Sequence, residues 1–495
     1  MKRKTLLKGA AFLLGFLLLL LAANGVMKHK TVSDSGNQEL LNAENMYALT
    51  EDSVDVLVLG SSQVAFGVSP VEMYERSGIS AYSIGMSQAS MVSNYYWMLE
   101  FCKKQDPSVV MLDVSTLFEV SKETSERVSA DAMRLSPNKL ALARAATALH
   151  EESMLSYVFP LVKYHSRWYS LAAEDFGGYD NDYCYRGLNI TDKCKKGLSY
   201  TTLVIDNDDP EADVREMYDY QVAYFEKIVD YCLENDIKLL LFKTPKGSWT
   251  LSDSNQVQTL ADSCGLTYLD FNYEELLEAI GFDITTDMKD KDHLNTSGAD
   301  KLSDYLADYA AAQYDLPDLR EDLDYDLQIN EKLYETERTD AYLCATTDPA
   351  AWLALLKEHS DCDIFLSTYG DTAGLVSDEL AALLADLGLE TDLNELEEGY
   401  GFVAWLTNDG TSVEEKTEES YVSISGTLDN GVAYQMTSRN QSNRKQSKQL
   451  IGGEDQSINT PGLNITVYDE STETIIETVA IDLETGEMTC VTRSD

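Results

Sequence analysis

The sequence has few basic residues for its length. Its 495 residues include 38 Lys and Arg against 85 Asp and Glu, which gives a formal net charge of −47. A surplus of this size repels phosphate backbones, so it excludes nucleic acid as a partner. The hydrophobic content of 44% is ordinary for a globular protein, so the acidity does not indicate general disorder.

Side chains that bind metals are also scarce. The chain has five histidines, and it has neither a C-x-x-C motif nor a cluster of His and Cys. The sequence therefore predicts no zinc site, and we expect no metal and no organic cofactor. The eight cysteines permit disulfides in an exported chain, and Cys184 and Cys194, which flank a short polar loop, are a candidate pair.

The first 30 residues differ in charge from the rest. They contain six Lys or Arg and no acid, so residues 31–495 carry a net charge of −53. Leu6–Val26 is apolar and about long enough to cross a bilayer, and the basic residues before it predict a cytoplasmic amino end. The small residues of Leu21–Gly25 leave a cleavable signal peptide as the alternative. We expect a single-pass anchor in the cell membrane with the bulk of the chain outside.

Beyond residue 50, short apolar runs alternate with helical patterns. Strands are expected at Val54–Leu59, Ala81–Ile84, Val109–Val114, Lys238–Thr244 and Thr267–Phe271. Helices are expected at Pro70–Arg76, Gln88–Lys104, Pro210–Glu234, Tyr273–Ile280 and Gly298–Ala311. Continuous apolar strands separated by helices predict an α/β domain with a parallel sheet covered by helices, interrupted by an insertion at residues 120–205.

A second boundary follows this domain. Residues 316–339 are acidic and weakly periodic, which is typical of a linker. Beyond them, short strand-like runs predict a separate α+β or mostly β domain. The expected organisation is a cytoplasmic tip and transmembrane anchor at 1–30, a polar spacer at 31–50, the α/β domain at 51–315, the linker at 316–339 and the second domain at 340–495.

The first expected strand ends in Gly60-Ser61-Ser62. Ligands of open parallel sheets bind beyond the carboxyl ends of the strands, so a serine here is placed as a nucleophile would be. Such a serine needs a base, and the base needs a group that orients it. His293 lies in a polar loop before the last helix of the same domain, and Asp290 is three residues before it. Asp287 and Asp292 are nearby alternatives to Asp290.

These segments resemble the SGNH/GDSL hydrolase superfamily over residues 51–315. Gly60-Ser61-Ser62 would be the first block, with Ser61 in place of the usual aspartate, and Asp290 and His293 would be the last. The following Asn295 and Gly298 are also typical of that superfamily. The resemblance implies a flavodoxin-like parallel sheet in which Ser62 is the nucleophile, His293 the base and Asp290 the group that orients the base.

The same resemblance assigns an oxyanion hole. The backbone amides of Ser62 and Gly85 would contribute to it, although Gly85 also fits a tight turn. The third block of the superfamily usually supplies an asparagine, but here Leu112–Thr116 contains none. Ser115 or Thr116 would have to take its place.

Gly-Ser-Ser variants with an amino-terminal anchor resemble the D-alanyl-lipoteichoic acid transfer proteins and the alginate-acetylation-type proteins of the superfamily. The implied function is a membrane-anchored extracellular esterase or O-acyltransferase acting on acyl groups of a cell-envelope glycopolymer. The implied partner is a membrane-bound acyltransferase. Because the third-block asparagine is missing, the alternative is a catalytically inactive surface protein that binds glycan or serves assembly.

The insertion contains a candidate substrate-binding patch. His165, Arg167 and Trp168 combine a titratable group, a guanidinium and a large aromatic ring, which suits an anionic polymer unit. Packing between elements is the alternative interpretation.

Lys243–Lys246 also follows a strand at the functional edge, but we interpret it as a capped strand end outside the site. So acidic a domain favours a neutral glycan, or an anionic one screened by cations.

The carboxyl-terminal third has its own resemblance. Asp363–Asp371, Leu387–Leu389 and Gly462–Asp469 look like the interleukin-like EMT-inducer domain, which is also similar to the stem domain of some glycosyltransferases. The resemblance implies a binding or spacing role, with a glycan as the expected ligand.

Overall fold

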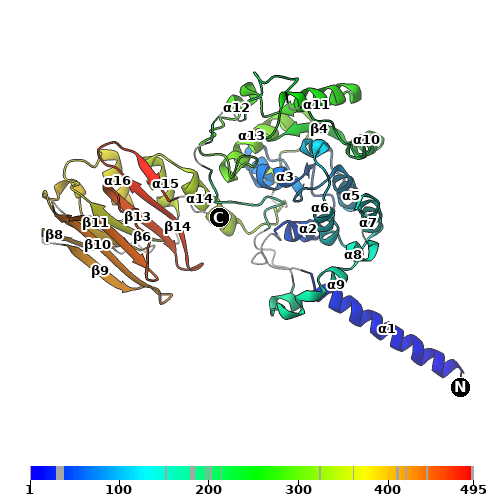
Figure 1. Ribbon diagram of the computed structural model, residues 1–495, viewed down its shortest axis with the longest axis horizontal. Helices are drawn as coiled ribbons and strands as arrows, with labels where there is room; N and C mark the ends of the chain where they lie inside the picture. The colour runs from blue at the N-terminus through cyan, green and yellow to red at the C-terminus, as the bar shows by residue number, and fades with distance from the viewer. Residues whose placement is uncertain are drawn as a thin grey trace. The chain divides into compact units, whose positions relative to one another are not determined.

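The computed structural model divides the chain into two compact units (Figure 1). The first comprises Met1–Thr191 and Lys195–Tyr334, and the second comprises Asp192–Cys194 and Glu335–Asp495. The residues that the structure describes are 2–28, 38–150, 153–178, 184–195, 198–199, 203–212, 214–322, 325–359, 362–407, 412–418, 421–441 and 444–491.

The first unit is built on a five-stranded parallel sheet in the order β2-β1-β3-β4-β5. Its strands are β1 (Val56–Gly60), β2 (Ala81–Gly85), β3 (Val109–Asp113), β4 (Lys238–Lys243) and β5 (Thr267–Asp270). All residues of β1, β2 and β3 are buried, as expected for strands covered on both faces. The predicted α/β parallel sheet is confirmed, and its order reverses between β1 and β3, where ligands of such sheets bind.

Helices cover both faces of this sheet (Figure 1). Leu57 and Leu59 of β1 enter one hydrophobic core, and Val56 and Val58 enter the other, because successive side chains of a strand point to opposite faces. The covering helices are α3 (Ser62–Gly67), α4 (Pro70–Ser77), α5 (Met91–Phe101), α10 (Asp219–Glu234), α11 (Leu251–Cys264), α12 (Glu274–Ala279) and α13 (Thr296–Gln313).

The insertion after β3 is mainly helical up to residue 178, and its described residues from 184 onwards lie in turns and irregular segments. It contains a 3-10 turn η1 (Ser115–Phe118), the helices α6 (Glu123–Ala132), α7 (Pro137–His150), α8 (Met154–Val158) and α9 (Pro160–Lys163), and the 3-10 turns η2 (His165–Tyr169) and η3 (Glu174–Phe176). These elements extend the first unit towards the amino-terminal helix α1 (Lys2–Val26), and α9 contacts α1 directly.

Two segments differ from their sequence-based assignment. Part of the expected spacer forms α2 (Gln38–Ala48), in which Leu41 is fully buried and the carbonyl of Asn42 accepts a hydrogen bond from the Tyr82 hydroxyl. Much of the expected linker also packs on the first unit. There, the amide of Leu319 in the 3-10 turn η5 (Leu319–Glu321) donates to the Gly78 carbonyl at 3.0 Å, and α14 (Glu331–Ala345) follows. Both segments contribute buried side chains to the first unit, Leu41 in α2 and Tyr334 in α14, which bind them to the core.

The second unit contains two antiparallel sheets and flanking helices, in agreement with the expected α+β or mostly β domain. One sheet has the order β15-β14-β13-β6-β7-β8 and the other β12-β11-β10-β9. The strands are β6 (Asp363–Tyr369), β7 (Gly401–Leu406), β8 (Ser412–Thr417), β9 (Val422–Thr427), β10 (Ala433–Gln441), β11 (Arg444–Ile451), β12 (Glu454–Asp455), β13 (Gly462–Asp469), β14 (Thr474–Ile481) and β15 (Met488–Cys490). The helices are α15 (Pro349–Glu358) and α16 (Asp378–Asp386), with a 3-10 turn η6 (Leu393–Glu395).

Candidate active site

The turn between β1 and α3 places Ser62 at the carboxyl edge of the sheet. Gly60 has no room for a side chain, because an added Cβ would lie 2.4 Å from Val64 Cγ2 and 3.1 Å from Asp113 Cβ. Ser61 caps α3, with its hydroxyl accepting from the amide of Gln63 at 3.4 Å. Ser62 is therefore the first helical residue after a turn that only glycine allows.

Ser62, His293 and Asp290 form a continuous hydrogen-bonded relay. Ser62 Oγ lies 2.9 Å from His293 Nε2, and His293 Nδ1 lies 3.0 Å from each carboxylate oxygen of Asp290. An ionised carboxylate only accepts hydrogen bonds, so Nδ1 carries the proton and the lone pair of Nε2 faces the serine. The relay is open to solvent, since the side chains of His293 and Asp290 are 25% and 46% exposed.

The carboxyl of Asp290 is held ionised by its surroundings. Partial burial alone would raise its pKa, but hydrogen bonds from the imidazole of His293 and the amides of Asp292 and His293 outweigh burial and bring the pKa to about 2. The two amides lie 2.8 and 3.0 Å from Oδ1. A carboxylate fixed in this way orients the imidazole and stabilises its protonated form.

The other two candidate carboxylates do not contact the imidazole. Asp287 is buried and binds Lys301 Nζ at 2.7 Å and the Ser297 hydroxyl at 2.9 Å. The carboxylate of Asp292 accepts from the amide of Ser248 at 3.2 Å. Asp290 is thus the one of the three that the structure brings to His293.

Asn295 and Gly298, the other two residues of the last block, each have a structural role. Asn295 is the N-cap of α13, and its side chain accepts from the amide of Gly298 at 3.1 Å. A Cβ at Gly298 would lie 2.4 Å from the carbonyl oxygen of Asp287. Asn295 and Gly298 therefore fix the start of α13 directly behind the loop that carries His293.

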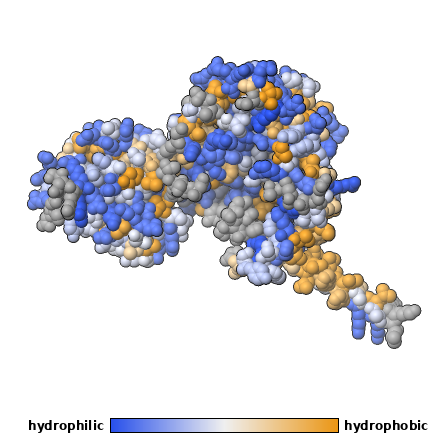
Figure 2. Space-filling view, viewed as in Figure 1, coloured by the Kyte–Doolittle hydropathy of each residue, from blue (hydrophilic) through white to orange (hydrophobic). Residues whose placement is uncertain are grey.

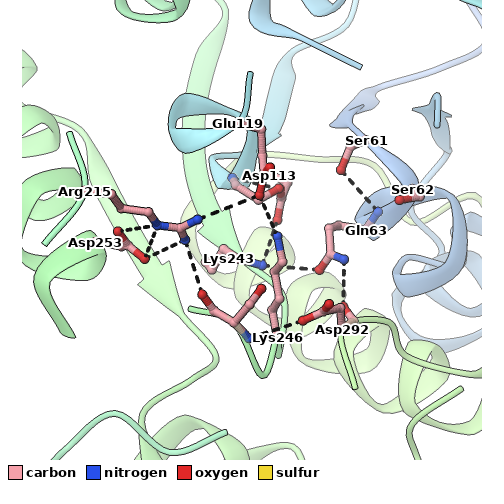
Figure 3. Close-up of polar contacts among 12 residues, drawn as sticks. Ser61, Ser62, Gln63, Asp113, Glu119, Arg215, Lys243, Lys246, Asp253 and Asp292 are labelled. Atoms are coloured by element: carbon pink, nitrogen blue, oxygen red, sulfur yellow. Dashed lines mark hydrogen bonds and ion pairs between the residues drawn. The ribbon is translucent and has the colours of Figure 1, made fainter. Parts of the chain in front are cut away.

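Gln63 ties the loop of His293 to the serine turn (Figure 3). Its side-chain amide donates to the carbonyl of Asp292 at 2.7 Å, and its Oε1 accepts from Thr244 Oγ1 at 2.6 Å and from Lys243 Nζ at 3.3 Å. Gln63 is itself buried, with 5% of its surface exposed. It follows Ser62 and binds the residue that precedes His293, so it couples the two halves of the relay.

Lys243 supports Gln63 from a fully buried position. Its ammonium also donates to the carbonyl and hydroxyl of Thr244 at 2.7 and 3.0 Å, and it lies 3.7 Å from Asp113 Oδ2. Burial lowers the pKa of Lys243 to about 8, although the charge of Asp113 opposes the shift. The interpretation of Lys243 as a residue outside the site was too simple, because it connects β3, β4 and Gln63.

Gln63→Glu and Gln63→Met are both expected to lower kcat about 10- to 100-fold with little change in KM, since both lose the donor to Asp292 and let the base loop shift. The Glu variant keeps an oxygen that accepts from Lys243 and Thr244. A fall in kcat that both variants share is therefore due to loss of the bond to Asp292. Thr244→Val, which removes another bond of Gln63, is the control and should stay within about fivefold of the parent. Steady-state kinetics on folded protein provides the measurement; full kcat in Gln63→Glu would contradict this role.

The third block lacks an amide side chain, as the sequence indicates. The Ser115 hydroxyl and amide both donate to Asp113 Oδ1, so Ser115 is committed to that carboxylate. Thr116 Oγ1 is buried in η1 without a hydrogen-bond partner among the described residues. Of the two predicted substitutes, Thr116 is the one with an uncommitted hydroxyl.

Gly85 ends β2 beside Gly60, its partner across the parallel pair. A Cβ at Gly85 would lie 2.3 Å from the amide nitrogen of Ala65 in α3. The close approach of strand and helix therefore explains the glycine. Its role as an oxyanion donor stays a prediction.

The candidate patch of His165, Arg167 and Trp168 is not brought to Ser62. It lies on η2, next to α9, which Figure 1 draws beside the carboxyl end of α1 and away from α3. Arg167 donates to the carbonyls of Met27 and Lys28 at 3.0 and 3.1 Å. Its guanidinium is therefore engaged with the two residues that follow α1.

Sequence reasoning missed the residues around the imidazole. The ring of Phe66 meets that of His293 edge-on, with centroids 6.0 Å apart, and Lys289 Nζ lies 3.4 Å from the centroid of Phe66. Phe66 and Gln63 lie in the helix that starts at Ser62. Their closeness to Ser62 in the sequence is the signal that could have identified them. Within the described residues, no group of three or more His, Cys, Asp or Glu side chains could hold a metal ion.

Comparison with solved structures finds weak overall similarity to two bacterial proteins. One is a putative acylhydrolase from Bacteroides fragilis, with 10% identity over 55% of this chain and 94% of that one and a TM-score of 0.26. The other is a GDSL-like lipase from Bacteroides thetaiotaomicron, with 9% identity over 56% of this chain and all of that one and a TM-score of 0.27. No family model and no curated protein matches the sequence.

Proposed function

We propose that this protein is a serine hydrolase of the SGNH type that cleaves or transfers an ester-linked acyl group. The relay from Asp290 through His293 to Ser62 Oγ carries the proposal. It lies at the carboxyl edge of β1, beside the point where the strand order reverses. Both hydrogen bonds have the length that general-base catalysis needs.

In the proposed mechanism, Ser62 Oγ attacks the acyl carbonyl while His293 Nε2 takes its proton. The amides of Ser62 and Gly85 and the hydroxyl of Thr116 donate to the oxyanion of the tetrahedral intermediate. The C–O bond to the leaving alcohol then breaks, His293 returns the proton to that alcohol, and an acyl-Ser62 ester remains. Water or a second hydroxyl attacks this ester by the same steps in reverse.

The substrate and location are proposed from the apolar helix near the amino terminus and from the charge of the chain. Lys4–Val26 is apolar enough to cross a membrane and is not buried in the protein, which supports an anchor. An exported catalytic domain acts on the cell envelope, so the proposed substrate is an acylated envelope glycopolymer and the proposed partner a membrane-bound acyltransferase. The net charge of −53 beyond residue 30 favours a neutral glycan or one screened by cations.

A fluorophosphonate probe tests the chemistry. The purified full chain is expected to form a covalent adduct at Ser62, which mass spectrometry of its peptides locates, and Ser62→Ala should not react. Ser61→Ala is the matched control, because it removes a neighbouring hydroxyl that caps α3 and should still be labelled. No adduct, together with no release of acyl groups from p-nitrophenyl acetate or acetylated oligosaccharides, would overturn the proposal.

A further inference from the structure

The segment from Ser153 to Phe176, called the foot below, differs in composition from the rest of the chain. Ser153–Ala173 contains no Asp or Glu, although acids make up 85 of the 495 residues, and it includes Lys163, His165 and Arg167. A stretch of 21 residues without an acid, in so acidic a chain, repels anionic headgroups less than the rest of the chain does.

The foot also exposes large apolar and aromatic side chains. Beyond α1, the described residues expose seventeen such side chains, and six of them are in the foot. They are Met154, Leu155, Val162, Trp168, Tyr169 and Phe176, of which Tyr169 is 96%, Phe176 68% and Trp168 59% exposed. Exposed apolar side chains gathered in one segment mark an interaction surface, whereas single ones need no explanation.

Hydrogen bonds fasten the foot to the end of α1. The amide of Leu161 donates to Asn24 Oδ1 at 3.0 Å, and Arg167 donates to the carbonyls of Met27 and Lys28. Met27 and Lys28 directly follow α1, so Arg167 fixes the chain just beyond the end of the helix. Arg167 is fixed in turn by Asp175, at 2.7 Å.

The other side of the foot is fixed to the domain. Lys163 Nζ and the Tyr164 hydroxyl both bind Asp131 Oδ2 in α6, at 2.9 and 2.7 Å. The foot is thus held between α6 and the end of α1. Figure 2 shows the apolar surface of α1 continuing up to the body of the domain at the place where Figure 1 draws α9.

We infer that the foot lies in the headgroup region of the same bilayer that α1 crosses; this inference rests on the proposed anchoring. Lys4–Val26 has 23 residues, and at 1.5 Å per residue it spans about 35 Å, against a hydrocarbon core of about 30 Å. Residues 24–28, to which the foot is bound, therefore emerge at the interface. Trp and Tyr are enriched at that depth, where an aromatic body meets apolar chains and a polar tip meets water.

Lipid quenching of tryptophan fluorescence tests the inference on the full chain in nanodiscs. The chain has five tryptophans. Trp97, Trp249 and Trp352 are at most 3% exposed, Trp405 lies in the second unit, and Trp168 is in the foot. Emission is expected to fall by about a fifth to a third in discs of brominated phosphatidylcholine relative to ordinary phosphatidylcholine, because bromine quenches only in near contact. Trp168→Phe should abolish this difference, and Trp405→Phe should leave it.

Two added tryptophans, one in the foot and one elsewhere, test whether the result of Trp168→Phe reports the position of the foot. In that background, Tyr169→Trp should restore quenching, while Leu233→Trp, at a 79% exposed position in the last turn of α10, should not. Equal emission in the two lipids from protein that co-purifies with the discs would overturn the position of the foot and leave the anchor standing. Protein that does not enter discs at all would overturn the anchor itself.

Discussion

Ser62→Ala and His293→Ala are each expected to lower kcat/KM for an ester substrate by about 10⁴- to 10⁶-fold. Ser62→Ala removes the attacking oxygen. His293→Ala removes the imidazole nitrogen, 2.9 Å from Ser62 Oγ, that accepts the proton of the serine hydroxyl. Because the two residues act as one unit, the double variant should be no slower than the slower single variant. Hydrolysis of p-nitrophenyl acetate by each purified variant, with thermal unfolding measured in parallel, provides the test.

The matched control is Ser61→Ala, which changes the adjacent serine. It removes an N-cap of α3, which costs about 1 kcal/mol of stability, and should retain kcat/KM within about tenfold. Ser62→Ala retaining parental activity, or Ser61→Ala losing as much as Ser62→Ala, would contradict the assignment of the nucleophile.

The pH dependence follows from Asp290. Its pKa of about 2 keeps the carboxylate ionised throughout the pH range of an ester assay, so Asp290 should add no proton to the acid limb of kcat/KM. In Asp290→Asn the amide favours the other tautomer of the imidazole, and kcat should fall by about 10²- to 10⁴-fold. A two-proton acid limb in the parent enzyme would contradict an ionised Asp290.

The parts of this picture that the sequence predicts are those with local signals. Apolar runs such as Val56–Leu59 predict a sheet buried on both faces, and the strands observed agree with that pattern. Asp290 and His293 are three residues apart in one loop, so spacing allows their contact, and the structure selects Asp290 over Asp287 and Asp292. The pairing of that loop with Ser62, 231 residues away, came from the resemblance of the two blocks to one superfamily.

The parts that were missed depend on contacts between distant segments. Gln63 and Lys243 are 180 residues apart, and neither position has a periodic pattern that announces the bond between them. The chemistry of Arg167 left two interpretations open, a ligand for anions and packing between elements, and the structure shows it binding backbone carbonyls of the amino-terminal segment. The helix α11 did have a local signal, the capping box of Thr250 and Asp253, which went unused.

Lys243→Met is expected to destabilise the first unit by about 3–5 kcal/mol, because it leaves the buried carboxylate of Asp113 without its cation. For a unit of this size, the loss lowers its melting temperature by on the order of 10 °C. Lys238→Met is the matched control on the same strand. Lys238 is 60% exposed and pairs with an exposed Asp236, so its loss should cost at most about 1 kcal/mol. Differential scanning calorimetry measures both.

The double variant Lys243→Met/Asp113→Asn separates charge from packing. It removes both buried charges and keeps an amide that can accept from Ser115, so stability should return to within about 1 kcal/mol of the parent. Activity should not return with it. Gln63 Oε1 still lacks the ammonium donor, so kcat of the fully folded double variant should stay about three- to fivefold low. If Lys243→Met is no more destabilising than Lys238→Met, Lys243 is not the counter-charge of Asp113; if the double variant regains full kcat, Gln63 does not need Lys243 to hold the base loop.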